Sequence, residues 1–138
     1  MKLSNDTREV LKNYSTINQN LMINAGSTLT TMSAMKNIVA RATVTETFEK
    51  DVAIYDLNEF LAALSLFENP DLDFQDDFVM MGNEGSRKSL RYWYSDPSVV
   101  TTVTREITMP ECEVSFKFSD KDCPNKPKPP VIKIFFFI

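Results

Sequence analysis

Two amphipathic helical patterns, each followed by short alternating segments, constrain the fold of this chain more than any other feature. The first spans residues 4–14 and carries an inward stripe of Thr7, Val10, Leu11 and Tyr14. The second is the strongest helical pattern in the sequence, and its stripe consists of Leu57, Phe60, Leu61, Leu64 and Phe67. A helix with one apolar face must bury it, so both helices are expected to pack against strands.

Capping residues predict where both helices begin. Ser4 precedes the first helix and Asp6 lies in its first turn, where a negative charge favours the helix dipole. Asp56 precedes the second helix. Pro70 predicts its end at Glu68 or Asn69, because proline disfavours helical conformation at the preceding residue.

Strand patterns occupy the chain between and after these helices. Before the second helix they cover residues 17–23, 28–33, 38–44 and 48–54, with turn residues at 24–27. After it they cover residues 72–74, 78–81 and 89–94, with a hairpin connection at 82–86. The order predicts an α+β fold with antiparallel strands and both helices on one face of a curved sheet.

The two halves of this layout suggest a duplicated unit of about 50 residues. Each half consists of one helix followed by strands. Setting Asn5 against Asn58 aligns three pairs of inward positions: Val10 with Ala63, Leu11 with Leu64, and Tyr14 with Phe67.

Composition excludes several classes of chemistry. The chain has 138 residues, a net charge of -4 and no histidine, so neither a Ser-His-Asp triad nor a histidine-containing zinc site can be built within it. Cys112 and Cys123 are too few for a disulfide scaffold and favour a reduced, intracellular setting. Neither a signal peptide nor a membrane span of about 20 apolar residues is visible.

No cofactor, metal or enzymatic site is expected. The acidic run Asp71, Asp73, Asp76 and Asp77 has the composition of a calcium loop, but Asp76 stands where that loop needs glycine, so a solvated turn is favoured. No nucleophile has a candidate base, and the carboxylates do not form a recognisable acid and base pair.

The cationic residues leave two interpretations open. Arg8 and Lys12 are four residues apart and leave the first helix on the same face, which suits either simple solvation or contact with phosphate. A second group mixes cations and aromatic residues, which can stack on single-stranded nucleic acid: Arg87, Lys88 and Arg91 with Tyr92, Trp93 and Tyr94. Because alternate residues of a strand face opposite ways, core and edge packing is favoured there.

Several segments resemble the sliding clamps of T-even-type phages. They include MKLS at residues 1–4, LKN at 11–13, TIN at 16–18 and, most specifically, the region 52–66 within DVAIYDLNEFLAALSL. Asp96-Pro97-Ser98 stands where that family leaves its first domain. The likeness covers roughly residues 1–100 in order, and 101–122 more loosely.

The resemblance implies a non-enzymatic processivity factor with the DNA clamp fold. Family members form a closed head-to-tail homotrimer around double-stranded DNA, are opened by a clamp loader, hold the DNA polymerase on its template and assist late transcription. They would act in the cytoplasm of the infected bacterial host, without cofactor or membrane. Arg8 and Lys12, and more weakly Lys2, would then face the DNA. The strand Ser89, Leu90, Arg91, Tyr92 and Trp93 would be a candidate subunit edge.

The C-terminal part departs from the family. We expect a first clamp domain at residues 1–108, the start of a second at 109–122, and an atypical Pro-rich and apolar tail at 123–138. Residues 119–122 predict a helix cap, but the prolines that follow exclude a helix. A frameshifted or truncated reading frame would explain this. The alternative function is therefore a lone clamp domain or structural remnant, prone to aggregate through its tail and its edge strand.

Overall fold

The computed structural model describes residues 1–83, 85, 87–103 and 132–136. Helix α1 (Asn5–Ile17) is followed by strands β1 (Leu21–Ile23), β2 (Gly26–Met32), β3 (Ile38–Phe48) and β4 (Val52–Ile54). Helix α2 (Leu57–Ser65) is followed by β5 (Asp71–Phe74), β6 (Phe78–Gly82), β7 (Ser89–Trp93) and the short 3-10 turn η1 (Pro97–Val99). Strand β8 (Ile132–Phe136) is the last element.

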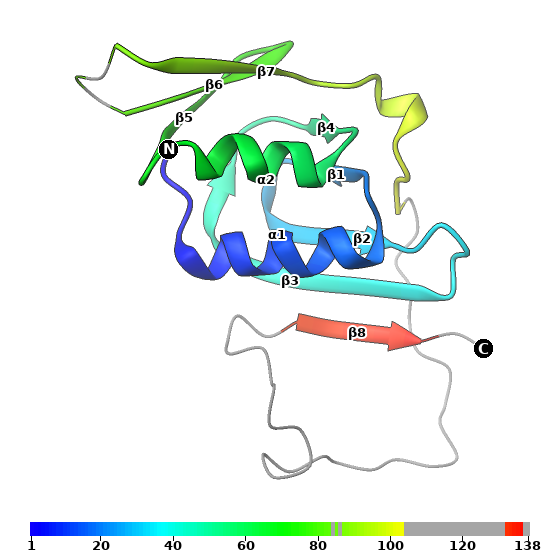
Figure 1. The fold of residues 1–138 in the computed structure, drawn as a ribbon. Coiled ribbons are helices and arrows are strands. Elements are labelled where there is room, and N and C mark those ends of the chain that lie inside the picture. The colour runs from blue at the N-terminus through cyan, green and yellow to red at the C-terminus, as the bar shows by residue number, and fades with distance from the viewer. Residues whose placement is uncertain (84, 86, 104–131, 137–138) are drawn as a thin grey trace, which may run out of the picture.

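Both helices lie side by side on one side of the strands, as the sequence predicts (Figure 1). The predicted inward stripe of α1 is buried at all four positions, and Ser4 accepts from the backbone N–H of Thr7 as its N-cap. Asp56 caps α2 in the same way, by accepting from the backbone N–H groups of Asn58 and Glu59. The α+β fold class is thereby confirmed.

The strands form three separately hydrogen-bonded groups rather than one continuous curved sheet. Their orders are β1-β4, β2-β3-β8 and β5-β6-β7, and every pair is antiparallel. Single backbone hydrogen bonds connect segments outside these ladders: Ser95 N–H donates to the Ala53 carbonyl at 2.9 Å, and Leu72 N–H to the Met1 carbonyl at 2.7 Å. The core beneath the helices therefore joins strand groups that do not share a ladder.

Several predicted boundaries are wrong. Helix α1 runs to Ile17, which was assigned to a strand, and α2 stops at Ser65, so Phe67 lies beyond its end and is only half-buried. Phe48 ends β3 instead of starting β4, because the strand continues through the polar residues 45–47 and Phe48 pairs with Gly26 beyond a shift in register. Gly26 begins β2 with a φ of +123°, a backbone conformation that favours glycine.

The duplicated unit is present in element order but not in strand pairing. Val10, Leu11, Ala63 and Leu64 are all buried, as the internal alignment predicts. However, β5, β6 and β7 form one meander, whereas β1 pairs with β4 and leaves β2 to pair with β3.

The predicted second-domain start at 109–122 and both cysteines lie outside the described residues. Of the apolar tail, residues 132–136 form β8 and add an antiparallel strand to β3. The sequence assigned no element there. None of the helices in the described part of the chain is long and apolar enough to cross a membrane.

Candidate nucleic-acid interface

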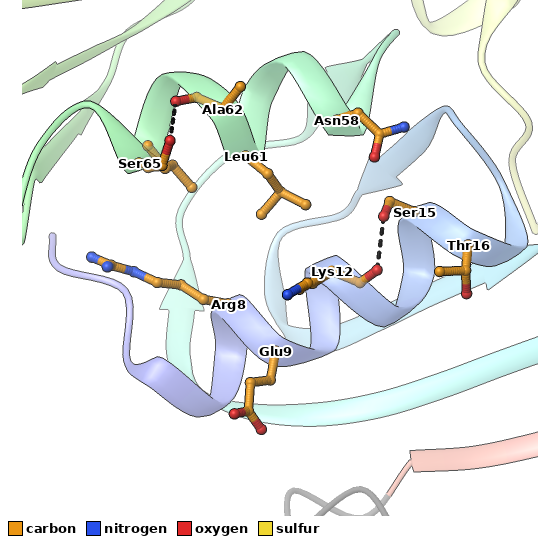
Figure 2. Close-up of a pocket in the computed structure, with 10 residues that line it drawn as sticks. Arg8, Glu9, Lys12, Ser15, Thr16, Asn58, Leu61, Ala62 and Ser65 are labelled. Carbon is orange, nitrogen blue, oxygen red and sulfur yellow. Dashed lines mark hydrogen bonds between the residues drawn. The ribbon is translucent and has the colours of Figure 1, made fainter.

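A groove with a volume of about 530 Å³ runs between α1 and α2 on the side facing away from the strands (Figure 2). The two helices can leave such a groove because most of their large apolar side chains turn to the strands. Leu61 is the exception: it was predicted to face inward, but it is only partly buried and lines the groove. Its lining is mixed: Arg8, Glu9, Lys12, Ser15 and Thr16 from α1, and Asn58, Leu61, Ala62, Leu64 and Ser65 from α2.

Lys12 is the freest cation of the groove. Its side chain is exposed and lines the groove (Figure 2). Within the described residues the ammonium has neither an ion pair nor a hydrogen-bond partner. The side-chain amide of Asn58, across the groove on α2, is likewise unpaired within that part of the chain. Both groups can therefore donate to an incoming acceptor.

Arg8 is more constrained than the sequence suggests. Its side chain is half-buried, and its Nη2 donates to Asn69 Oδ1 at 3.2 Å, beyond the C-terminal end of α2. Its Nε is enclosed and has no partner among the described residues. Helix α2 has no basic residue in its last turn, so a guanidinium at this end suits the helix dipole. Arg8 therefore bridges the helices as well as facing the groove.

Lys2 is not brought into the groove. It is exposed and forms an isolated antiparallel bridge with Asp71 at the start of β5. The N-terminal ammonium donates to Asp71 Oδ1 at 2.7 Å, and this hydrogen bond lowers the pKa of the Asp71 carboxyl, with a smaller contribution from the charge of Lys2. Of the three predicted DNA-facing residues, the structure gathers only Arg8 and Lys12.

The helix pair carries no excess of positive charge. Asp6, Glu9 and Glu59 stand on the same two helices as Arg8 and Lys12, so three acidic residues oppose two basic ones. Glu9 belongs to the groove lining, although its carboxylate points away from α2 in Figure 2. The positive character of this surface is therefore local, and long-range attraction of nucleic acid is weak.

Glu46 of β3 fixes the N-terminal end of α1. Its carboxylate accepts from the Ser4 backbone N–H and from the Thr7 hydroxyl, the latter at 2.5 Å. Partial burial raises the pKa of Glu46, but these hydrogen bonds outweigh it, and the net effect is a lowered pKa. The sequence did not reveal this anchor, which sets the start of the helix that carries Arg8 and Lys12.

Two serine hydroxyl groups of the groove donate hydrogen bonds to carbonyl groups of their own helices. Ser15 donates to the Lys12 carbonyl at 2.7 Å, and Ser65 donates to the Ala62 carbonyl at 2.7 Å, as Figure 2 shows. Their oxygens can still accept. The sequence analysis did not identify Ser15 or Asn69. The i, i+3 spacing from Lys12 could have identified Ser15, but only tertiary structure identifies Asn69.

Strand β7, the predicted subunit edge, lies at the edge of the β5-β6-β7 group in the described part of the chain. Its residues alternate as expected. Tyr92 turns inward, packs edge-to-face on Phe60 with centroids 5.3 Å apart, and donates to the Asp56 carbonyl at 3.3 Å. Arg91 faces outward and lies 4.6 Å from the centroid of the Phe78 ring, beside the exposed Trp93. These contacts account for the basic and aromatic cluster as strand packing. A role as subunit edge stays a prediction.

Sequence comparisons place this geometry in a family. The family described as DNA polymerase processivity factor matches residues 4–83, which include both helices. The chain is 39% identical over 110 residues to the sliding clamp of Vibrio phage KVP40, covering 80% of this chain and 49% of the relative. It is 34% identical to the sliding clamp of Enterobacteria phage T4, covering 80% and 48%. The chain thus spans about half the length of these relatives.

Solved structures agree at the level of the fold. PCNA from Thermococcus kodakaraensis superimposes with a TM-score of 0.58 at 14% identity, covering 82% of this chain and 51% of that one. The Helicobacter pylori beta clamp gives a TM-score of 0.56 at 18% identity, covering 80% and 33%. With the fold shared and the family match extending over more than half of the sequence, this chain belongs to the DNA polymerase processivity factor family.

Proposed function

We propose that this chain is the first domain of a DNA sliding clamp subunit, which keeps a DNA polymerase on double-stranded DNA by enclosing the duplex. The single observation that carries the proposal is the family match over residues 4–83. The proposed division is a first domain at 1–108, the start of a second at 109–122 and a distinct tail at 123–138. Enclosure involves no chemical step, so no catalytic residue and no cofactor is required.

The groove between α1 and α2 is the surface we assign to the DNA. Lys12 would donate to phosphate oxygens directly or through water, Asn58 would add a neutral donor, and Arg8 would contribute while held by Asn69. Contacts of this kind carry no sequence information and weaken with salt. Lys2 would contribute only at the margin, because it lies beside β5. The three acidic residues that oppose two cations on these helices would be tolerable in a ring, since enclosure does not depend on net attraction.

The partners follow from the same proposal. A closed ring would be a homotrimer, would need a clamp loader to open it, and would receive the polymerase on its surface; family resemblance adds a role in late transcription. The clamp would act in the cytoplasm of the infected bacterial host. Strand β7, at the edge of its group, would supply the subunit edge.

A titration with duplex DNA at low ionic strength, followed by NMR chemical shifts, tests the surface. Amide shifts should cluster on the groove residues of α1 and α2 and should be the same for two unrelated DNA sequences. Lys12→Gln should weaken binding and lower the salt slope by about 1, because one phosphate contact is lost. Lys36→Gln is the matched control, an exposed lysine in the β2–β3 turn. Equal effects of both variants would overturn the assignment.

Assembly separates the clamp from the alternative of a lone domain. Light scattering should give a discrete ring-sized oligomer, and the protein should stay on nicked circular DNA and leave when the circle is cut. A monomer or a polydisperse sample that is not retained by circles would favour the lone clamp domain instead.

A further inference from the structure

The guanidinium of Arg8 is bound at one end of the groove between α1 and α2. Arg8 lines the groove, but its Nη2 donates to Asn69 Oδ1 at 3.2 Å, and Asn69 is not part of the lining. Figure 2 shows the guanidinium pointing away from Lys12, the other cation of the groove. Its Nε is enclosed by neighbouring atoms. Arg8 is therefore less available to a ligand in the groove than Lys12 is.

The group that binds Arg8 is neutral. Within the described residues Asn69 is the only hydrogen-bond partner of the guanidinium, and no carboxylate forms an ion pair with it, although Glu68 directly precedes Asn69. A hydrogen bond from arginine to a neutral amide oxygen is weaker than one to a carboxylate or phosphate oxygen. A phosphate that reaches the groove can therefore displace Asn69 from the guanidinium.

We propose that Asn69 is a positioning residue that restrains Arg8 and so limits its contact with DNA. The inference rests on the proposed function of the groove. DNA would first contact the free ammonium of Lys12, and Arg8 would make its full contact only after losing the hydrogen bond to Asn69. Asn69 is exposed and has no other side-chain hydrogen bond among the described residues, so replacing it should leave the fold intact.

Binding of the full chain to a short fluorescent DNA duplex tests the restraint. Asn69→Ala should tighten binding at low ionic strength by roughly two- to fivefold, because Arg8 no longer gives up a hydrogen bond. The dependence of log K on log salt should become steeper, by at most about 0.9, the value for one full phosphate contact. Fluorescence anisotropy over a series of potassium chloride concentrations measures both quantities.

Asn5→Ala is the matched control. Asn5 is an exposed asparagine at the start of α1, and its side chain has no hydrogen bond in the described part of the chain. The control should change neither the affinity nor the salt dependence.

Asn69→Asp should act in the opposite direction, because a carboxylate binds the guanidinium more firmly than an amide does. The new charge also repels DNA directly, so both Asn69 variants are repeated in a chain that carries Arg8→Gln. The effect of Asn69→Ala should vanish there, and that of Asn69→Asp should shrink to the repulsion alone. A purely structural role of Asn69 would not depend on Arg8 in this way.

NMR of the chain without DNA tests the hydrogen bond itself. In Asn69→Ala the Nε–H signal of Arg8 should exchange faster with water, because the guanidinium is no longer held where its Nε is enclosed. In Asn5→Ala the exchange should match that of the unmodified chain. Equal exchange in all three proteins would show that Asn69 does not restrain Arg8.

The DNA measurements separate this inference from the proposed function. If Lys12→Gln weakens binding but Asn69→Ala changes neither affinity nor salt dependence, the inference is wrong and the DNA surface stands. Weaker binding by Asn69→Ala would also contradict it, because Asn69 would then present Arg8 to the DNA. If neither Lys12→Gln nor Asn69→Ala has an effect, the inference and the assigned DNA surface both fail.

Discussion

Glu46 accepts hydrogen bonds from the N-cap residue Ser4 and from Thr7 in the first turn of α1, and its pKa is lowered as a result. A lowered folded-state pKa means that the stabilisation is present above the unfolded-state pKa and is lost as pH falls through the folded-state value. Glu46→Gln should therefore lower the free energy of unfolding by about 1 kcal/mol at neutral pH, a modest value because the carboxylate is partly exposed.

Urea denaturation at pH 7 and pH 3 checks this expectation. The difference between the unmodified chain and Glu46→Gln should shrink as the pH falls from 7 to 3, because protonation of the carboxyl removes the charged acceptor. Glu49→Gln, at an exposed position just after β3, serves as the control and should change little at either pH. A difference that stays the same at both values would mean that the charge of Glu46 is not what holds α1.

At the scale of elements, the start of α2 depends on Asp56. It accepts from the backbone N–H groups of Glu59 and Asn58, at 3.1 and 2.9 Å, and from Gln19 Nε2 at 2.7 Å. The hydrogen bond from Glu59 makes the largest contribution to its lowered pKa. Asp56→Ala should fray the first turn and speed amide exchange at Asn58 and Glu59 several-fold, because two donors lose their acceptor.

Asp56→Asn is the matched variant, since asparagine caps helices as well as aspartate does. It should keep exchange at Asn58 and Glu59 close to that of the unmodified chain. Equally fast exchange in both variants would show that the charge, and not the capping oxygen, maintains the turn.

The features of helices and strands that the sequence predicted correctly are those that depend on residues close together in the chain. The stripe of α1 follows from residue spacing, and both N-caps follow from side chains next to the helix. The end of β3 was missed because Thr45 and Thr47 are exposed and Glu46 bonds to α1, a contact that spans about forty residues of sequence. The Arg8–Asn69 contact and the β3–β8 pairing are also non-local. Local patterns therefore identified the groove cations but not how firmly each is held.

At the scale of the molecule, the absence of histidine and the distribution of shifted pKa values define a pH range of constant stability. No side chain with an ordinary pKa between about 5 and 8 is present in the sequence, so stability should be flat there. Below that range stability should fall, because hydrogen bonds lower the pKa of five carboxyls: Glu46, Asp56, Asp71, Asp76 and Asp96.

At pH values above that range, the ionisation of buried tyrosines should lower stability. It raises the pKa of Tyr94 to about 12, and it also raises the pKa of Tyr92. A raised folded-state pKa stabilises the protein below the unfolded-state value near 10, and this contribution is lost as pH rises through the folded-state value. Melting temperatures measured from pH 3 to pH 11 should form a plateau with a fall at each end. A steady slope between pH 5.5 and 8 would contradict this expectation.

The scarcity of cations in the groove has a consequence for motion. A protein that travels along a duplex must break and remake each phosphate contact at every step, so the number of such contacts sets the height of the successive barriers. With Lys12 free and Arg8 partly engaged by Asn69, a ring built from this domain would meet a nearly smooth energy profile along DNA. Its one-dimensional diffusion coefficient would then be limited by viscous drag from the solvent rather than by adhesion.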